Sequence, residues 1–396
     1  MRNPRISAIE LENFKCFRRQ RVDLGALTVL SGLNGMGKSS TIQALLLLRQ
    51  SVSNQRLQRR LRLSGDLIDL GTGEDALFDL ADQDAIAFVL ELERSRRIEY
   101  RYQYSRENDR LSLVMPGFPG RNTSDKMLNP DGKWVDYRSD GQRNMPGSGL
   151  TSLFSTAGFQ YLSAERFGPR KSLPWSSEQA STRSLGVHGE HVLAFLAEFG
   201  SSVLDETDPR VRDPEGVLTI EGQVSSWLQE TSPGATLDIS RMREIDALSA
   251  RFAYSRKGDV QSRAFRATNV GFGISYVLPV LTALIGARSG DLVIVENPEA
   301  HLHPRGQTRL GQLAGRAAKS GVQVLIETHS DHFLDGVRLD VKNQLSDGQD
   351  TRIHFFTRVG SETQVISPKV LENGSLSEWP KGFFDERDEN LLGLLG

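Results

Sequence analysis

A glycine-rich loop carries the clearest chemistry in this chain. Residues 32–39 read Gly-Leu-Asn-Gly-Met-Gly-Lys-Ser, after the apolar run 27–30 and before the helix-like run 42–48. Glycines let the backbone close around a phosphate, and successive amides at a helix N-terminus bind an anion. In this setting Lys38 neutralises the β- and γ-phosphates and Ser39 holds Mg²⁺. We therefore predict nucleoside triphosphate binding by the loop residues Asn34, Gly35, Gly37, Lys38, Ser39 and Ser40.

A second candidate site follows the apolar strand pattern of residues 292–295, which runs into Glu296-Asn297-Pro298-Glu299. Open α/β sheets bind ligands at the carboxyl ends of their strands. We therefore expect Glu296 to hold Mg²⁺, through water. The alternative is an ordinary acidic residue at a strand end, which the phosphate-binding loop makes the weaker interpretation.

A histidine follows the next apolar strand pattern, residues 322–326, in the run Glu327-Thr328-His329-Ser330-Asp331. At this place His329 can contact a γ-phosphate or polarise an attacking water. The alternative is a helix N-cap at Ser330 or Asp331, with His329 incidental.

Two further short motifs have competing interpretations. The run 269–275, with Gly271, Gly273 and Ser275, precedes an apolar helix pattern over 274–285, so it is either an anion site at a helix N-terminus or a simple glycine turn. The histidines of Ala300-His301-Leu302-His303-Pro304 suggest a metal site only weakly, because no further ligands have matching spacing. Pro304 alternatively marks a helix start.

The composition excludes several classes of protein. The 396 residues are 38% hydrophobic and 25% charged, with 48 basic and 50 acidic side chains, which is ordinary for a globular protein without a global basic field. Cys16 is the only cysteine, so no disulfide framework can form within one chain, as expected for the cytoplasm. No apolar run approaches the length of a membrane span, and we expect no membrane contact.

The order of apolar patterns predicts an α/β fold. Alternating residues at 6–14 and strand-like runs at 85–92, 97–104 and 110–115 indicate an antiparallel unit. In the second half, apolar strands alternate with helices at 274–285, 304–319 and 331–339, which indicates a parallel sheet covered on both faces. Because a parallel sheet accepts strands from distant sequence, we interpret the middle of the chain as an insertion into one nucleotide-binding domain.

Three basic clusters are candidates for contact with DNA phosphates: residues 56–62, residues 94–101, and Arg166 with Arg170. Each cluster is equally well explained by solvated surface arginines, which for residues 56–62 means a solvated helix face.

The motifs together, in this order, resemble the ABC-type ATPase head of SMC, RecF and OLD-family proteins. Residues 11–17, Leu-Glu-Asn-Phe-Lys-Cys-Phe, resemble the N-terminal strand of these families. Residues 32–39 resemble the Walker A loop and 292–296 the Walker B strand. Residues 269–275 stand at the position of the signature loop, 300–303 at the D-loop, and His329 at the switch histidine. Residues 371–385 resemble an uncharacterised C-terminal domain of some bacterial ATPases.

This resemblance implies a P-loop ABC-type head with a mixed sheet, an antiparallel β lobe and an inserted helical/β region. Residues 1–84 and 266–345 would form the two parts of the head. Residues 85–265 would form the β lobe and insertion, with a long mobile loop at 116–150, and 346–396 a small C-terminal domain. It further implies ATP and Mg²⁺ as cofactors. A second copy of the chain would complete each site in an ATP-sandwiched dimer, or a higher oligomer, through Gly271, Gly273 and Ser275.

The sequence departs from the family pattern at the catalytic position. The residue after the Mg²⁺ carboxylate is usually the catalytic carboxylate, but here it is Asn297, whose amide cannot accept a proton from water. Either Glu299 is the base, with His329 orienting the water, or hydrolysis is slow. The signature loop also differs, because it reads Gly-Phe-Gly-Ile-Ser.

Three functions compete. The first is an ATP-hydrolysing, dimer-forming ATPase in DNA maintenance or anti-phage defence that controls a partner effector or nuclease. The second is a slow or non-hydrolysing scaffold that holds an effector while ATP is bound, which Asn297 favours. The third is the ATPase subunit of a membrane transporter, which the N-terminal strand, the large insertion and the unusual signature loop disfavour.

Overall fold

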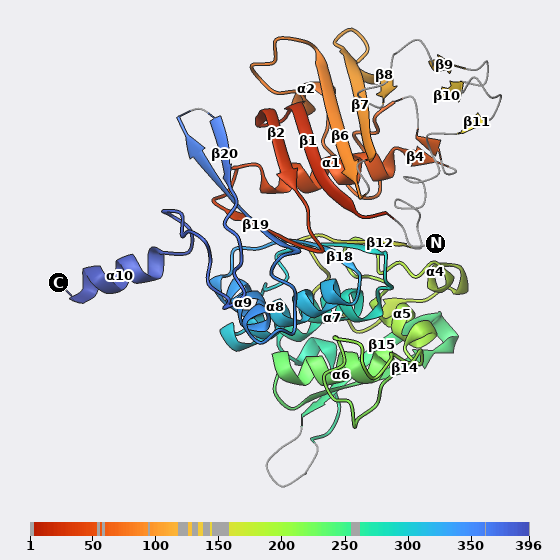
Figure 1. The fold of residues 1–396 in the computed structure, drawn as a ribbon. Coiled ribbons are helices and arrows are strands. Elements are labelled where there is room, and N and C mark those ends of the chain that lie inside the picture. Colours follow the sequence, from red (N-terminus) through yellow and green to blue (C-terminus); the bar gives the residue numbers. More distant parts are fainter. Residues whose placement is uncertain are drawn as a thin grey trace. The chain divides into compact units, whose positions relative to one another are not determined.

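The computed structural model describes residues 4–53, 56–57, 60–93, 96–117, 126–128, 134–137, 143–144, 158–254, 262–360 and 362–395. The chain divides into two compact units. The first comprises Met1–Leu24, Leu33–Ser155 and Phe356–Val365, and the second comprises Gly25–Gly32, Thr156–Phe355 and Ile366–Gly396. Each unit therefore contains segments that are distant in the sequence (Figure 1).

The first unit contains an antiparallel sheet with the strand order β2-β1-β6-β7-β8. Its strands are β2 (Phe17–Asp23), β1 (Ile6–Phe14), β6 (Ala85–Leu92), β7 (Arg96–Ser105) and β8 (Arg110–Gly117). Its buried face is aromatic: the ring of Phe88 meets Phe14 edge-on at 5.1 Å and Tyr102 at 6.3 Å. The predicted antiparallel unit is present, because alternating apolar residues bury one face of each strand.

Helix α1 (Lys38–Gln50) packs against β1 in the same unit. It carries a continuous run of buried aliphatic residues, from Ala44 to Leu48. The short elements β4 (Val52–Ser53), β5 (Arg56–Leu57) and α2 (Gly73–Ala76) follow. The expectation of a helix face at residues 56–62 is wrong, because β5 pairs with β4 in a hairpin, Val52 opposite Leu57.

The segment expected to be one long loop, residues 116–150, contains three short strands among its described residues. They are β9 (Lys126–Leu128), β10 (Trp134–Tyr137) and β11 (Arg143–Asn144), and β10 pairs antiparallel with both neighbours. The remainder of the predicted mobile loop, beyond the end of β8, lies outside the described residues.

The second unit is built on a parallel sheet with the order β12-β17-β18-β3, followed by β19. Its strands are β12 (Phe159–Leu162), β17 (Leu292–Glu296), β18 (Gln323–Glu327), β3 (Leu27–Gly32) and β19 (Thr351–Val359). The residues of β19 after Phe355 belong to the first unit. Most of the last strand, β20 (Glu362–Ile366), also belongs to the first unit. Glu296 lies opposite Glu327, and Glu327 opposite Leu30. β17 and β18 therefore end at the same level, and β3 continues for two residues beyond it, to Gly32. The fold class predicted from the sequence is confirmed.

Helices α7 (Phe272–Gly286), α8 (Pro304–Lys319) and α9 (Asp331–Lys342) lie beside this sheet (Figure 1). α8 and α9 cross at close range because each contributes a glycine. A Cβ atom at Gly311 would lie 2.0 Å from the Phe333 carbonyl oxygen, and one at Gly336 would lie 2.0 Å from that of Thr308. This contact fixes the starts of α8 and α9, which follow the ends of β17 and β18.

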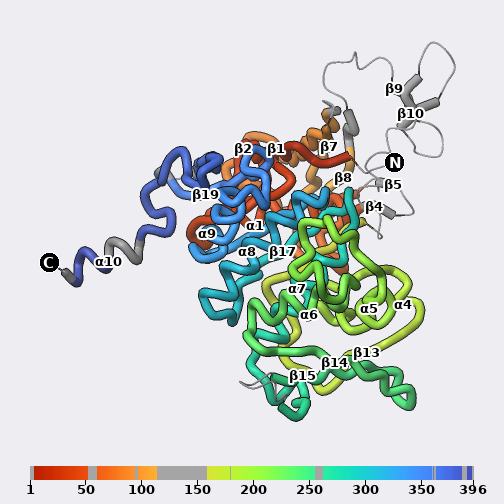
Figure 2. The backbone as a smooth tube through the Cα atoms, turned by 60° about the horizontal axis from the view of Figure 1, so that its bottom comes forward, coloured from red at the N-terminus to blue at the C-terminus, as the bar shows by residue number. Residues whose placement is uncertain are grey.

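The second unit contains a further sheet. It contains β13 (Leu173–Pro174), β15 (Ala247–Tyr254), β14 (Ala235–Met242) and β16 (Phe265–Arg266). Helices α5 (Val192–Phe199) and α6 (Ile220–Thr231) contact both α7 and this sheet (Figure 2). The remaining helices are α4 (Ser177–Ser181) and α10 (Glu386–Leu395). Within the described residues, every helix is too short or too polar to cross a bilayer.

Candidate functional site

The loop after β3 contains two glycines in the left-handed backbone region. Gly35 has a φ of 75° and Gly37 a φ of 95°. A Cβ atom at Gly37 would also lie 2.3 Å from the Phe17 ring and 2.8 Å from Cys16 Sγ. Helix α1 begins directly after Gly37, which has no side chain to cap it. The first amides of α1 therefore fit an anionic ligand.

Lys38 and Ser39 open α1. Lys38 is 3% exposed, and its Nζ donates to the Leu33 carbonyl oxygen at 2.8 Å, so the side chain folds back over the loop. Asn34 and Gly35 are exposed, Ser39 is half-buried and Ser40 is buried. An ammonium, a hydroxyl and helix-start amides in one short segment are the groups that a magnesium-bound phosphate requires. The loop residues from Leu33 onward and the start of α1 all belong to the first unit.

Glu296 ends β17, and both of its carboxylate oxygens accept hydrogen bonds within the second unit. Oε1 accepts from the Tyr161 hydroxyl on the neighbouring strand β12 at 3.1 Å, and Oε2 accepts from the Ala164 amide at 3.3 Å. Burial raises the pKa of the Glu296 carboxyl, although these bonds and the charge of Arg166 act in the opposite direction. A desolvated carboxylate held in one orientation fits a hard cation such as Mg²⁺.

The backbone turn at Asn297 brings Glu299 to the end of β18, beside the end of β17 that carries Glu296. Asn297 has a φ of 44°, in the left-handed region that asparagine tolerates better than most side chains. Its amide donates to the Glu327 carbonyl oxygen at 2.8 Å, and its own carbonyl accepts from the Ala300 amide at 3.1 Å. The resulting turn returns Glu299 to the end of β18, where its Oε1 accepts from the His329 amide at 2.8 Å.

Glu299 is chemically suited to act as a base. Burial raises the pKa of its carboxyl, against the His329 amide and the charge of Arg166. Its Oε2 is buried and has no hydrogen-bond partner among the residues that the structure describes. A carboxylate with an elevated pKa and one uncommitted oxygen is a stronger proton acceptor than a solvated one.

His329 and Ser330 divide two roles between them. The Ser330 hydroxyl caps α9 by accepting from the Phe333 amide at 2.9 Å, so the predicted helix cap is confirmed. The same hydroxyl donates to Gln307 Oε1 on α8. His329 is exposed, and its main chain is held by Glu299. The cap and the bond to Glu299 therefore position the main chain of His329 at the start of α9.

Arg166 is a site residue that the sequence did not identify. It is 2% exposed, so the expectation that it contacts DNA phosphate is wrong. Its guanidinium donates to three main-chain carbonyls: Ser163 at 2.9 Å, Glu296 at 2.7 Å and Asn297 at 2.6 Å. Burial lowers the pKa of Arg166 to about 10, so it remains charged at neutral pH. Arg166 fixes the turn that separates Glu296 from Glu299.

The start of α7 and the turn before α8 come together in the second unit. A Cβ atom at Gly273 would lie 2.6 Å from the His301 carbonyl oxygen, so only glycine permits this approach. The His301 ring meets the Tyr276 ring edge-on at 4.7 Å and lies 5.8 Å from Phe272, which is 57% exposed. Gly271 is exposed and Ser275 half-buried. The signature and D-loop positions therefore form one surface.

The two histidines of the 300–304 motif have different structural roles. The His301 ring contacts the aromatic rings of Tyr276 and Phe272, whereas His303 Nδ1 accepts from the Arg305 amide at 3.3 Å as the N-cap of α8. In the described part of the chain, no group of three or more His, Cys, Asp or Glu side chains is arranged to hold a metal ion. The predicted helix start at Pro304 is confirmed.

Two arginines of residues 94–101, Arg97 and Arg101, are engaged with carboxylates. Arg97 contacts Glu10 at 3.0 Å, and Arg101 contacts Glu12 at 3.0 Å. These ion pairs explain this cluster as a neutralised sheet surface. In the third predicted cluster, Arg170 is exposed, whereas Arg166 is buried.

Comparison with known proteins places this geometry in a family. A family model described as "AAA domain, putative AbiEii toxin, Type IV TA system" matches residues 27–335, and a family model described as a protein of unknown function matches residues 347–394. No curated protein matches the chain.

Solved structures share the fold. The SMC head bound to the C-winged helix domain of ScpA is 15% identical, with a TM-score of 0.50, and the match covers 93% of this chain and 98% of that one. The Smc head with an extended coiled coil bound to the C-terminal domain of ScpA from Pyrococcus furiosus is 13% identical, with a TM-score of 0.47 and 99% of each chain covered. The predicted ABC-type head is thus confirmed as a fold, and the chain belongs to the AAA domain family whose model spans its residues 27–335.

Proposed function

We propose that this chain binds and hydrolyses Mg²⁺·ATP, and that ATP joins it to a second copy of itself. The observation that carries the proposal is the loop after β3, where glycines with φ of 75° and 95° lead into a helix that begins with Lys38 and Ser39. Membership of an ATPase family supports the same ligand. Lys38 would bind the β- and γ-phosphates and Ser39 the metal ion.

The acidic strand ends would supply the second half of the chemistry. Bound Mg²⁺ neutralises charge on the phosphates and orients them. Glu296, held by Tyr161 and Ala164, would ligate the ion through water. Glu299 would accept the proton of the attacking water, and the exposed ring of His329 would orient that water. Asn297 would serve as the turn residue rather than as a base.

Nucleotide titrations test these roles directly. We expect Lys38→Ala to weaken Mg²⁺·ATP binding at least about 100-fold in calorimetry, because a buried cation on the phosphates is lost. Lys319→Ala is the matched control, since Lys319 is an exposed helical lysine that donates to the Gln344 carbonyl. Wild-type protein that is folded but shows no magnesium-dependent ATP affinity would overturn the proposal.

Phosphate release separates the base from the rest of the site. We expect Glu299→Gln to keep ATP affinity within about threefold and to lower kcat at least about 100-fold. Asn297→Gly keeps the left-handed turn and should retain most of the turnover. Wild-type turnover in the Glu299→Gln variant would exclude Glu299 as the base.

The proposed dimer would use the surface formed by Gly271, Gly273 and Ser275. Exposed Phe272 and the adjacent His301 ring support an interface there, because large exposed apolar side chains mark contact surfaces. Light scattering of the Glu299→Gln variant should show dimers with ATP and monomers without it. Phe272→Asp should abolish the ATP-dependent dimer, and an unchanged dimer would contradict this surface.

The second candidate function is an ATP-gated scaffold with slow or no hydrolysis, which Asn297 at the usual catalytic position favours. ATP-dependent dimerisation without phosphate release would support it. In either case we propose a cytoplasmic role in DNA maintenance or phage defence, through a partner effector or nuclease. Pull-downs with and without ATP test the partner, and DNA binding that falls steeply with salt tests direct contact.

A further inference from the structure

A chain of hydrogen bonds in the second unit joins Glu299 to the turn at residues 300–303. The Glu299 carboxylate accepts from the His329 amide at 2.8 Å. The main-chain carbonyl of Glu299 accepts from the Leu302 amide at 3.0 Å. Glu299 is therefore held twice, through its side chain at the end of β18 and through its main chain in the turn.

Gln307, near the start of α8, closes this chain of bonds with both ends of its amide group. Its Nε2 donates to the Leu302 carbonyl at 2.8 Å, and its Oε1 accepts from the Ser330 hydroxyl. Ser330 directly follows His329 and caps α9. The closed circuit that results, which we name the Gln307 network, consists of Glu299, Leu302, Gln307, His329 and Ser330.

The two bonds of Gln307 require a primary amide. The Leu302 carbonyl needs a donor. The Ser330 oxygen already accepts from the Phe333 amide, so its hydrogen needs an acceptor. A primary amide has both groups, whereas a carboxylate only accepts and an aliphatic side chain does neither. Ser330 is 5% exposed, so loss of its acceptor would leave a buried donor without a partner.

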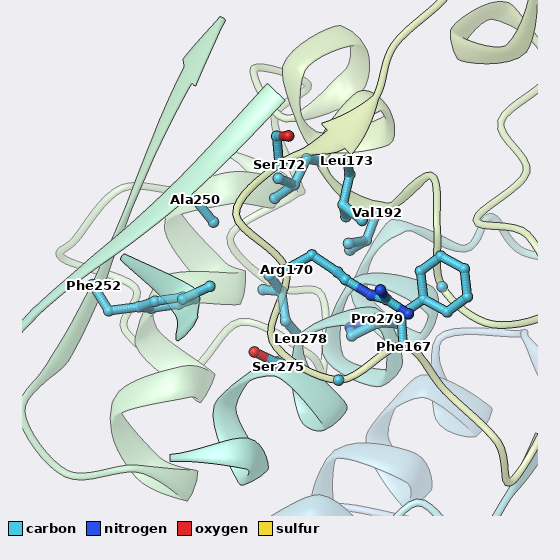
Figure 3. Close-up of a pocket in the computed structure, with 14 residues that line it drawn as sticks. Phe167, Arg170, Ser172, Leu173, Val192, Ala250, Phe252, Ser275, Leu278 and Pro279 are labelled. Atoms are coloured by element: carbon cyan, nitrogen blue, oxygen red, sulfur yellow. The ribbon is translucent and has the colours of Figure 1, made fainter. Parts of the chain in front are cut away.

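The turn at residues 300–303 also contacts the start of α7. The His301 carbonyl, one residue before Leu302, lies so close to Gly273 that a Cβ atom there would be 2.6 Å away. Between α7 and β15 the core leaves a cavity of about 40 Å³, lined in part by Leu278 and Phe252, with space for a few water molecules at most (Figure 3). A closely packed core absorbs little displacement, so a shift of the α7 start is passed to the turn.

We propose that Gln307 is a positioning residue, which sets Glu299 and His329 relative to each other and ties both to the turn that contacts α7. A second copy of the chain seated on Phe272 and His301 would thereby hold the base and the histidine in their working arrangement. This role rests on the proposed function, because it takes Glu299 as the base. Gln307 acts only through the other residues of the network and takes no part in the proton transfer.

Phosphate release and calorimetry on the full chain test this role. Gln307→Leu keeps the size of the side chain and removes both bonds, so we expect kcat to fall at least about 10-fold. The dissociation constant of Mg²⁺·ATP should stay within about threefold of wild type. ATP-dependent dimers should persist in light scattering, because the surface around Phe272 is unchanged. A loss of kcat without a loss of binding separates positioning from general damage to the fold.

Gln312→Leu is the matched control. Gln312 is also a buried glutamine of α8, 6% exposed, but its Oε1 accepts from Arg309 at 2.8 Å rather than from a residue of the network. The same substitution there should keep kcat within about twofold of wild type, because the site is independent of the network.

Gln307→Glu is a second variant, with a different effect on the fold. A carboxylate is favourable near the start of a helix and still accepts from Ser330, but it cannot donate to the Leu302 carbonyl. It should therefore lose turnover as Gln307→Leu does.

Amide exchange of the nucleotide-free protein, followed by NMR, tests the geometry without any ATP turnover. Glu299 holds the His329 amide in the wild type, and both Gln307 variants should raise its exchange rate at least about 10-fold. The amides of Leu325 and Ile326 within β18 should be unchanged, which reports that the sheet is intact. Gln312→Leu should leave the exchange of all three amides as in the wild type.

Three results would overturn the proposal. The first is a His329 exchange rate in both Gln307 variants that equals the wild-type rate. The second is an equal rise at Leu325 and Ile326, which would make Gln307 a general support of the fold. The third is a kcat in the Gln307 variants that is no lower than in Gln312→Leu. Wild-type protein without turnover would overturn the proposed function instead, and the exchange rates would still decide whether Gln307 positions His329.

Discussion

The carboxyl groups of Glu91 in the first unit and of Glu296 and Glu299 in the second have pKa values that are shifted in opposite directions. On the sheet of the first unit, Glu91 faces the guanidinium of Arg21 with two hydrogen bonds of 2.7 and 2.8 Å, and the bond to Arg21 lowers its pKa. At the strand ends of the second unit, burial raises the pKa of both Glu296 and Glu299. Their nearest arginine, Arg166, bonds to main-chain carbonyls rather than to either carboxylate.

This difference separates surface structure from a site. A carboxylate paired with arginine needs nothing further, whereas a desolvated carboxylate without a cation is costly to ionise. Binding of a metal ion or transfer of a proton would remove that cost. The raised pKa values of Glu296 and Glu299 therefore fit the magnesium and proton-transfer site that we propose for these residues.

Removal of Arg166 should have the largest effect on this arrangement. We expect Arg166→Leu to lower the free energy of unfolding by about 3–5 kcal/mol, because three carbonyl groups at a buried turn lose their donor. Arg166→Lys should recover only a minor part, since a single ammonium cannot reproduce the planar fork. Urea denaturation at neutral pH measures both.

Arg170→Leu is the control for Arg166, because Arg170 is an exposed arginine close by on the same segment. Its stability should change by less than about 0.5 kcal/mol. If Arg166→Leu were as mild as this control, the buried arginine would not be the residue that holds the turn between Glu296 and Glu299.

Glu299→Gln should have a smaller effect, and its sign should depend on pH. The folded pKa of Glu299 is raised, so the folded chain binds more protons than the unfolded chain between the two pKa values. Stability from this group is present at low pH and is lost as pH rises through the folded pKa. The variant escapes that loss, so without nucleotide its free energy of unfolding should rise relative to wild type as pH rises, by about 1 kcal/mol, and its Tm should rise with it.

Thermal unfolding at a series of pH values, without magnesium, measures this difference. Glu91→Gln provides the opposite slope in the same protein. A Tm difference for Glu299→Gln that falls as pH rises would show that the carboxyl is stabilised in its charged form and would remove the basis for its role as a base.

Much of the second unit could be predicted from the sequence because its signals are local. Uninterrupted apolar runs predicted β17 and β18, and Pro304 after His303 predicted the start of α8. The helix expected at residues 56–62 was not found, because charge density says nothing of backbone pairing, and Val52 and Leu57 close a hairpin instead.

The site was predicted only where a motif carried it. Lys38, Ser39 and Glu296 belong to patterns with fixed spacing, and their roles remain proposals. Tyr161 and Arg166 could not be recognised, because about 130 residues separate them from Glu296 and only the pairing of β12 with β17 joins them. Asn297 looked like a missing base, whereas its left-handed backbone shows why a turn-forming residue stands there.

The smallest expected effect belongs to Glu91→Gln in the first unit. Its pKa is lowered below the ordinary value of 4.5 by the hydrogen bonds from Arg21, so the pair stabilises the fold above that pH. This stability is lost as pH falls through the folded pKa. Near neutral pH the variant should be less stable than wild type by about 0.5 kcal/mol, the usual size for a partly exposed ion pair. Urea denaturation near pH 7 and near pH 3 measures the change.

Salt provides the discriminating control for this last prediction. The cost of Glu91→Gln near neutral pH should shrink at about 1 M salt, because exposed ion pairs are screened at that ionic strength. The cost of Arg166→Leu should persist in the same salt, because a buried guanidinium bonded to carbonyl groups is screened far less. Equal salt sensitivity in the two variants would mean that salt screens the Arg166 guanidinium as strongly as the exposed Arg21–Glu91 pair. The contrast between a neutralised surface and a buried site would then not hold.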